Sequence, residues 1–353
     1  MKNKVISFIF VLYLVIFSLL HIFIPDKDIS ITERRSLVKF PEFKFSSEYI
    51  SSLDKYLLDH FPFRDDFRSF KALFNYKVLN TYDNNKIYLK DNYIFKSNYP
   101  TNKKNIDNFI IKTLKVSENF KNNNVYMMII PDKNYYLEID NFLHLDYEYI
   151  FNRVNDLGFN NIDIKDELSL DKYYETDTHW RQEKINSVVS KYLKSVGIKE
   201  ENIDYKINSY DKFYGVYYGE SAINRNAEVI NYLTCDNFDN ITVSYLENNN
   251  LNEIYNLDKL KSLDSYEVFL DGASSFIEIN NNNSFTDREL IVFRDSFGSS
   301  FIPLIASYYK KITVIDNRYI NSNFFKDMVE FDNQDILFLY STLIINESST
   351  LKG

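Results

Sequence analysis

The sequence predicts an α/β protein in which helices cover both faces of a mostly parallel sheet, preceded by a transmembrane helix. Two observations carry this prediction. Short, uninterrupted apolar runs alternate with amphipathic stretches beyond residue 105, which is the pattern of repeated strand–helix units. At the other end of the chain, Val5 to Ile24 contains no charged residue. A chain of 353 residues is long enough to build one large domain, or two small ones, with a substantial core.

The charge-free segment is long enough to cross a membrane. At 1.5 Å per residue it spans roughly 30 Å, the thickness of the hydrocarbon core of a bilayer. Lys2 and Lys4 precede it, and the positive-inside rule keeps them in the cytoplasm and sends the rest of the chain outward. A cleaved signal would have a shorter apolar run and a small-residue cleavage site, which Phe23-Ile24-Pro25-Asp26 does not offer. The pattern favours an uncleaved signal anchor over a cleaved signal, and both over a buried helix of a soluble protein.

The rest of the chain is predicted to form one extracytoplasmic domain. Residues 1–4 are a cytoplasmic tail, 5–24 the transmembrane helix, 25–45 a charged linker and 46–353 the domain. The domain opens with a lead-in over residues 46–100. This lead-in holds two helices, over 46–59 and 64–79, and a hairpin over 86–95 that turns at Lys90-Asp91-Asn92.

The α/β part follows from apolar runs and helical periodicity. Strands are predicted over 125–130, 162–164, 290–293, 312–315 and 336–339, and helices over 105–119, 146–157, 182–196 and 302–309. Residues 200 to 285 are rich in Asn and are predicted to be irregular, with short strands at best. The alternation indicates parallel strands with helices on both faces.

The composition excludes several classes of protein. The formal net charge of −9 argues against a nucleic-acid-binding protein, which would carry a basic surface. The single cysteine, Cys235, cannot form an internal disulfide or a cysteine-based zinc site. Aromatic residues make up 17% of the chain, so it is not disordered by composition. Asn is abundant throughout, so clusters of Asn are poor indicators of function.

One serine lies where the chemistry of such a sheet is expected. Catalytic groups of open α/β sheets gather beyond the carboxyl ends of the strands. Arg294-Asp295-Ser296-Phe297-Gly298 directly follows the predicted strand 290–293 and precedes a helical stretch. A hydroxyl there could attack a carbonyl carbon while backbone amides bind the oxyanion. The alternative is that Ser296 or Asp295 only caps the helix.

A serine nucleophile needs a base and a group that orients the base. The chain has four histidines, and only His179 lies two residues after an acid, in Tyr173-Tyr174-Glu175-Thr176-Asp177-Thr178-His179-Trp180. In an extended segment, residues two apart project to the same side, roughly 7 Å apart at the backbone. Asp177 can therefore reach one imidazole nitrogen and leave the other for Ser296. The pair could also be two ligands of a divalent metal, although no third ligand is evident.

These motifs together resemble the DHHW protein family and the alginate O-acetyltransferase proteins of the SGNH-hydrolase-like superfamily. Three flanking features agree with the resemblance: Asp59-His60-Phe61-Pro62-Phe63-Arg64-Asp65, the hairpin after it, and Phe213-Tyr214-Gly215 between the His and Ser motifs. The resemblance covers roughly residues 33 to 345 in the family's order. No single motif is specific, but their joint order is. It implies an SGNH-like three-layer α/β domain.

The resemblance also implies roles for individual residues. Ser296 is then the nucleophile, His179 the general base and later acid, and Asp177 the orienting carboxylate, with no cofactor and no metal. Two residues depart from the family pattern. Thr178 stands where the first His of the family motif is found, and Arg294 where a Gly commonly precedes Asp-Ser. Candidate substrate contacts are Tyr214, Arg318, Arg294 and Trp180. Packing explains Tyr214 and Arg318 at least as well, and it is the better explanation for Trp180; His60 and Arg64 are expected to be structural.

The predicted function is acyl transfer outside the cell, with Ser296 carrying an acetyl group to a polysaccharide of the cell envelope or a secreted one. The resemblance implies a membrane-bound O-acyltransferase partner that exports the acetyl group. Two alternatives remain open. Water in place of the sugar hydroxyl gives a carbohydrate esterase with the same triad. A degenerate domain gives a non-catalytic envelope protein that binds glycan or a membrane partner.

Overall fold

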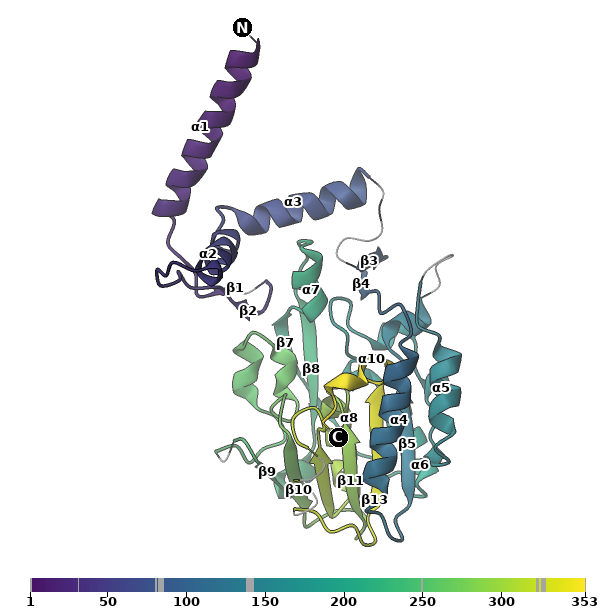
Figure 1. Ribbon diagram of the computed structural model, residues 1–353. Coiled ribbons are helices and arrows are strands. Elements are labelled where there is room, and N and C mark those ends of the chain that lie inside the picture. The colour runs from purple at the N-terminus through teal and green to yellow at the C-terminus, as the bar shows by residue number, and fades with distance from the viewer. Residues whose placement is uncertain are drawn as a thin grey trace. The chain divides into compact units, whose positions relative to one another are not determined.

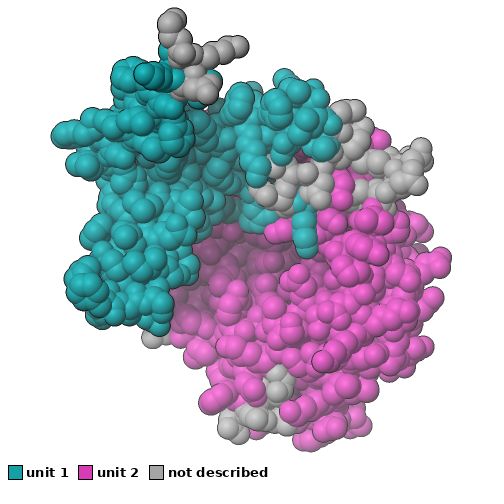
Figure 2. Space-filling view, turned by 45° about the horizontal axis from the view of Figure 1, so that its top comes forward, with its two compact units in different colours: residues 1–87, 216–226 teal, residues 88–215, 227–353 magenta. Residues whose placement is uncertain are grey.

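A computed structural model describes residues 2–30, 32–79, 81, 86–137, 143–248, 250–321, 324 and 328–352. The chain divides into two compact units, which Figure 2 colours separately. Unit 1 comprises residues 1–87 and 216–226, and unit 2 comprises residues 88–215 and 227–353. Unit 2 holds the sheet and every residue of the predicted triad.

Unit 2 is built on a mixed, mostly parallel sheet (Figure 1). Among the described residues, seven strands pair in the order β6-β5-β13-β11-β12-β10-β9. The first five of these run parallel, whereas β10 pairs antiparallel with both β12 and β9. The strands are β5 (Val125–Ile130), β6 (Asn160–Asn161), β9 (Ile241–Tyr245), β10 (Phe276–Asn281), β11 (Glu289–Arg294), β12 (Lys311–Ile315) and β13 (Asp335–Ser341).

The central strands are apolar throughout because both faces of the sheet are covered. In β11, Leu290 and Val292 belong to one hydrophobic core, whereas Ile291 and Phe293 belong to the other. The first core takes in side chains of α6 (Asn186–Ser195) and α8 (Gly298–Ile305). The second core takes in side chains of α4 (Lys103–Ser117), α5 (Tyr147–Asn155) and α10 (Thr342–Asn346). The period-two alternation therefore gives a three-layer α/β fold, as predicted.

The segment from 200 to 285 is more regular than we predicted. It contains β7 (Lys206–Phe213) and β8 (Glu228–Thr234), which form an antiparallel ribbon, and also β9 and β10. In β9, Ile241, Val243 and Tyr245 are buried while the residues between them are exposed. The prediction of an irregular segment is therefore wrong: these strands alternate, and the surrounding polar residues obscure the alternation.

Three boundaries also differ from the prediction. Strand β6 lies two residues before the predicted 162–164, although Ile162 and Ile164 are buried. Helix α6 starts at Asn186, after a 3₁₀ turn over Gln182–Lys184, because the Gln182 side chain binds Leu233 N and Ser300 O. Helix α8 starts at Gly298, directly after the serine motif.

Unit 1 begins with α1 (Lys2–Phe23), followed by α2 (Ser47–Asp59) and α3 (Arg64–Lys77). The part of α1 from Lys4 to Phe23 is long and apolar enough to cross a membrane, and none of it is buried. A signal sequence would meet the same criteria. Unit 1 also holds the short strands β1 (Ile29–Ser30) and β2 (Arg35–Ser36) and the helix α7 (Val216–Ser221).

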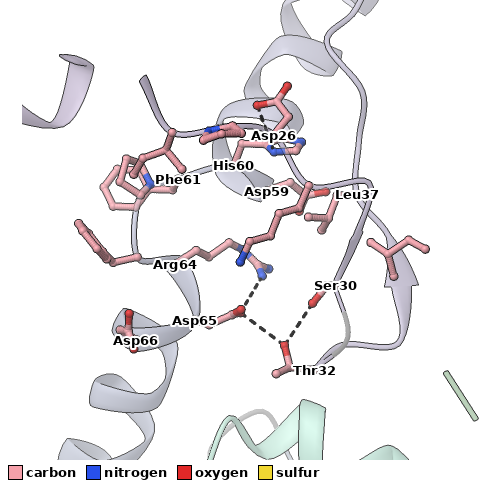
Figure 3. A pocket seen from close by; sticks show the side chains of 16 residues that line it. Asp26, Ser30, Thr32, Leu37, Asp59, His60, Phe61, Arg64, Asp65 and Asp66 are labelled. Atoms are coloured by element: carbon pink, nitrogen blue, oxygen red, sulfur yellow. Dashed lines mark hydrogen bonds and ion pairs between the residues drawn. The ribbon is translucent and has the colours of Figure 1, made fainter. Parts of the chain in front are cut away.

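The corner between α2 and α3 is held by side chains from the segment that follows α1. His60 Nε2 lies 2.9 Å from the Val38 carbonyl oxygen, and Arg64 forms two hydrogen bonds with Glu33. Arg35 binds both carboxylate oxygens of Asp59, at 2.9 and 2.6 Å. Both His60 and Arg64 therefore make contacts inside unit 1, and their structural role stays a prediction. Figure 3 shows this corner around a cavity of about 560 Å³ that Asp26, His60 and Arg64 help to line.

Candidate active site

Polar side chains follow four neighbouring parallel strands at the edge of the sheet where those strands end. Asp132 follows β5, Ser341 and Thr342 close β13, Asp295 and Ser296 follow β11, and Asp316 follows β12. Because these strands run parallel, their carboxyl ends meet at one edge, where the ligands of open α/β sheets bind.

Ser296 stands on the turn between β11 and α8. The turn is fixed by the buried Asp295, which accepts a hydrogen bond from Phe297 N (3.0 Å) and one from Ser341 N (2.7 Å). Ser296 is partly exposed, and its hydroxyl does not cap α8: the cap residue is Phe297, without a side-chain cap. The capping alternative is therefore wrong for Ser296. Among the described residues, the Ser296 amide N–H donates to no acceptor, so it can bind an oxyanion.

The three residues of the predicted triad lie in one hydrogen-bonded chain. His179 Nε2 is 2.8 Å from Ser296 Oγ, and His179 Nδ1 is 2.6 Å from Asp177 Oδ1. The same Asp177 oxygen accepts the His179 backbone amide at 3.0 Å. Asp177 is 1% exposed and His179 is 8% exposed. This arrangement favours the tautomer that carries its proton on Nδ1 and leaves Nε2 free to accept the serine proton.

Aromatic rings fix the imidazole plane. The Tyr266 ring stacks on His179 with ring centroids 3.8 Å apart and planes inclined by 8°. The Tyr266 hydroxyl lies 2.8 Å from Ser300 Oγ, and Trp180 Nε1 donates to the same Ser300 oxygen, also at 2.8 Å. Burial raises the pKa of Tyr266 well above its ordinary value, so its hydroxyl stays protonated. The ring of His179 is therefore held from its face as well as through its nitrogens.

A buried lysine binds the carbonyl oxygens of the segment that carries the base. Lys133 Nζ donates to Tyr174 O (3.1 Å), Glu175 O (3.2 Å) and Asp177 O (2.6 Å). Lys133 is 2% exposed, and burial lowers the pKa of its ammonium group to about 7. Three hydrogen bonds use all three protons of the charged form.

A carboxylate binds the amides of the same segment. Glu228, on β8, accepts hydrogen bonds from Glu175 N (2.8 Å) and Thr176 N (2.7 Å), and it pairs with Arg181 at 2.7 Å. We call residues 173–181 the histidine loop. Lys133 and Glu228 together satisfy much of its backbone hydrogen-bonding capacity, although the loop has little regular structure.

The Phe213-Tyr214-Gly215 element packs on the histidine loop. Gly215 N donates to Thr176 Oγ1 at 3.0 Å, and the Phe213 ring lies 4.8 Å from the Tyr174 ring. A Cβ atom on Gly215 would lie 2.3 Å from the carbonyl carbon and oxygen of Thr176. Only glycine permits this close approach of two backbones.

The four predicted substrate contacts fall into two groups. Arg294 and Trp180 are fully buried, at 0% exposure, which argues against the ligand contacts that we expected for them. Arg294 binds Ser299 Oγ and Gly272 O and lies 3.6 Å from Asp316, so its charge is used inside the fold. The indole N–H of Trp180 is already used in hydrogen bonds at the start of α8.

The other two predicted substrate contacts, Tyr214 and Arg318, keep part of their side chains exposed. Tyr214 is 41% exposed. Arg318 keeps 17% of its side chain exposed while it donates to both carboxylate oxygens of Asp316, at 2.9 and 2.6 Å. Asp316 follows β12, the strand next to the one that precedes Ser296, so Arg318 belongs to the same edge of the sheet.

The metal-binding alternative finds no support in the geometry. Asp177 and His179 bind each other, and the remaining imidazole nitrogen faces Ser296. Within the described residues, no group of three or more His, Cys, Asp or Glu side chains is placed to hold a metal ion.

Sequence reasoning missed three residues that support the triad: Lys133, Glu228 and Tyr266. The rule that selected Ser296 also applies to Lys133, because Asp132 and Lys133 follow Pro131 at the end of β5. Nothing comparable marks Glu228 and Tyr266. Both come from the segment that we predicted to be irregular.

The comparisons with known proteins agree with this fold. No protein-family model and no curated protein matches the sequence. A DHHW family protein from Eubacterium siraeum aligns with a TM-score of 0.63 and 17% identity, over 77% of this chain and 97% of that chain. Bacillus cereus PatB1, solved with a sulfonyl adduct, aligns with a TM-score of 0.59 and 20% identity, over 73% of this chain and 95% of that one.

The O-acetyltransferase domain of Pseudomonas putida AlgJ also aligns, with a TM-score of 0.42 and 10% identity over 74% of this chain and 92% of that chain. That likeness is too weak to carry an inference. At such identities the first two matches show the fold alone. The chain has the α/β fold of these two proteins, one of which is a DHHW family protein, and this confirms at the level of the fold the resemblance that its motifs suggested.

Proposed function

We propose that this protein is a serine-dependent acyltransferase that moves an acetyl group onto a cell-envelope or secreted polysaccharide outside the cell. The observation that carries the proposal is the hydrogen-bonded chain Asp177–His179–Ser296, with distances of 2.6 and 2.8 Å. Nucleophile, base and orienting carboxylate each have the partner that acyl transfer requires.

The geometry supports a two-step reaction. In the first step His179 Nε2 takes the Ser296 proton as Oγ attacks the acyl carbonyl carbon, and the Ser296 amide binds the oxyanion. Imidazolium then returns the proton to the leaving group, and an acyl-serine remains. In the second step His179 takes the proton of an acceptor hydroxyl as its oxygen attacks the acyl carbon. The bond from that carbon to Ser296 Oγ then breaks, and the imidazolium returns the proton to Oγ. Asp177 stabilises the imidazolium in both steps.

The location and partners complete the proposal. The apolar helix α1 anchors the chain in the membrane, and Lys2 and Lys4 hold its N-terminus in the cytoplasm. Acetyl-CoA is a cytoplasmic donor, so a membrane-bound O-acyltransferase partner would deliver the acetyl group to Ser296. If water replaces the sugar hydroxyl, the same acyl-serine makes the protein an esterase. Analysis of the products formed with a polysaccharide acceptor separates transfer from hydrolysis.

A sulfonyl fluoride tests the nucleophile directly, because an activated serine displaces fluoride to give a stable sulfonyl ester. Phenylmethylsulfonyl fluoride should label the wild-type chain on Ser296, as located by peptide mass spectrometry. Ser296→Ala should lose the label and lower hydrolysis of 4-nitrophenyl acetate by about 10⁴-fold. Ser190→Ala, at a partly exposed serine on α6, is the matched control and should keep both properties. Unchanged labelling and hydrolysis in Ser296→Ala would exclude this serine as the nucleophile.

A further inference from the structure

Helix α3 has an exposed apolar face. Phe67, Phe70, Phe74 and Val78, the residue that follows the helix, are separated by three, four and four residues, so they lie on one side of it. Their exposed fractions are 46%, 68%, 43% and 64%. We call these four residues the phenylalanine stripe. An amphipathic helix of a soluble protein turns such a stripe toward the core, whereas an exposed apolar patch marks a binding surface.

An adjacent face of α3 binds the rest of unit 1. Arg64 pairs with Glu33 at 2.7 Å, and Arg68 donates to Gly219 O at 2.9 Å. Ala72 is 1% exposed and packs inward. The helix cannot roll to bury the phenylalanine stripe without breaking these contacts. The outward orientation of the stripe is therefore fixed by the fold.

The stripe is continuous with the apolar helix α1. The Phe17 ring on α1 stacks on Phe61 with centroids 5.3 Å apart, and it lies 6.1 Å from the ring of Phe67. Phe17 lies six residues before the end of α1 at Phe23, which is about 9 Å along the helix axis. If α1 crosses the bilayer, Phe17 lies within the hydrocarbon region. The rings of Phe61, just before α3, and Phe67, in its first turn, then lie at the same depth.

We propose that the phenylalanine stripe lies in the outer leaflet of the bilayer that α1 crosses, so that α3 is an interfacial helix. Apolar side chains of such helices reach about 5–10 Å into the boundary between headgroups and acyl chains, which matches the depth of Phe17. Lys71 and Lys77 are exposed beside the stripe, where their ammonium groups can reach lipid headgroups. The cavity of Figure 3, which both apolar and charged side chains line, begins directly after the span, at Ile24, Pro25 and Asp26.

Depth-dependent quenching tests this proposal on the full chain. The protein is reconstituted into phosphatidylcholine–phosphatidylglycerol vesicles that contain no other protein, with bromine placed near the ester end or near the end of the acyl chains. Phe70→Trp should lose emission, and more strongly with bromine near the ester end. Phe74→Trp provides a second site on the stripe. The native Trp180 is fully buried and gives a constant background.

Two controls make each outcome decisive. Leu12→Trp, in the middle of α1, should be quenched most by bromine at the chain ends, which reports correct insertion of the span. Ile207→Trp, at a 58% exposed apolar site on β7, should not be quenched. If Leu12→Trp is quenched while both stripe variants match Ile207→Trp, the stripe does not contact lipid. The proposal is then wrong. Loss of quenching in Leu12→Trp would instead overturn the span itself.

Discussion

The ammonium group of Lys133 is the least expected charge in unit 2. It is buried against three carbonyl oxygens of the histidine loop, and Tyr93 and Phe95 rings lie within 5.9 Å of it. The carboxylates of Asp132, Glu175, Asp177 and Glu228 favour its charge, but burial outweighs them and lowers its pKa to about 7. A neutral amine has only two protons to donate, so one of the three carbonyl oxygens loses its donor when Lys133 deprotonates.

The stability of the fold should therefore depend on pH through this residue. The pKa of Lys133 is about 7 in the folded chain and has its ordinary value of 10.5 in the unfolded chain. Between these values the unfolded chain binds more protons, so this group makes the free energy of unfolding rise with pH. Thermal unfolding at pH 7 and pH 9 tests this. The melting temperature of wild type minus that of Lys133→Met should be larger at pH 9 than at pH 7. If this difference in melting temperature is instead smaller at pH 9, the pKa of Lys133 is not depressed in the folded chain.

Gly215 makes a second prediction at the scale of one residue. Gly215→Ala places a methyl group 2.3 Å from the Thr176 backbone and 2.5 Å from Asp177 Cβ, so the histidine loop must move. Displacement of a catalytic group by about 1 Å costs up to about 10²-fold in rate. We expect ester hydrolysis to fall by about that factor, together with a lower melting temperature.

Gly158→Ala is the matched control. Gly158 has a φ of +71°, but nothing lies within 4 Å of an added Cβ. That variant should lose about 1 kcal/mol of stability from backbone strain and keep its turnover. Equal turnover in the two variants would show that the position of the histidine loop does not limit the reaction.

At the scale of the element, the histidine loop depends on β8. Glu228 is the acceptor for two loop amides and the partner of Arg181, and its side chain is only 7% exposed. Removal of one partner of a buried pair costs about 3–5 kcal/mol because the other charge stays buried. Glu228→Ala should therefore lower both the denaturation midpoint and the turnover.

Glu201→Ala gives the comparison for Glu228. Glu201 pairs with Lys199, whose side chain is 84% exposed, and such surface pairs contribute about 0–1 kcal/mol. Denaturant titration of both variants separates the buried pair from the surface pair. Similar losses in the two would mean that Glu228 does not support the loop.

The elements that could be predicted from sequence are those whose signal is local. Strands β5, β11, β12 and β13 are buried on both faces, so they appear as uninterrupted apolar runs. Strands β9 and β10 complete the sheet as antiparallel partners. The position of β10 depends on pairing with β12, and that of β9 on pairing with β10. Only the weak alternation of Ile241, Val243 and Tyr245 marks β9 in the sequence.

The residues of the candidate site also divide into those that a local sequence pattern marks and those that it does not. Asp177 and His179 are two residues apart, and Ser296 follows an obvious strand, so the sequence alone selects all three. Tyr266 comes from a 3₁₀ turn over Ser265–Val268, and Glu228 from the start of β8. Their contacts with the histidine loop arise only in the folded chain, and no local pattern could have predicted them.

At the scale of the whole molecule, the orientation of the chain can be measured. In a Cys235→Ser background the chain contains no other cysteine. Asp211→Cys, at an exposed position on β7, should react with a membrane-impermeant maleimide in intact cells. Asn3→Cys, before the span, should react only after the cells are permeabilised. Protection of Asp211→Cys in intact cells would reverse the proposed orientation.

The order of the strands has a consequence for when the site can form. Ser296 lies 117 residues after His179, and its strand β11 is held between β12 and β13, both of which follow it in the chain. A chain that crosses the membrane with its N-terminus retained delivers these two strands last. In the orientation that we propose, the nucleophile would therefore meet its base only after nearly the whole chain has been translocated, and a partly exported chain would not turn over an acyl ester.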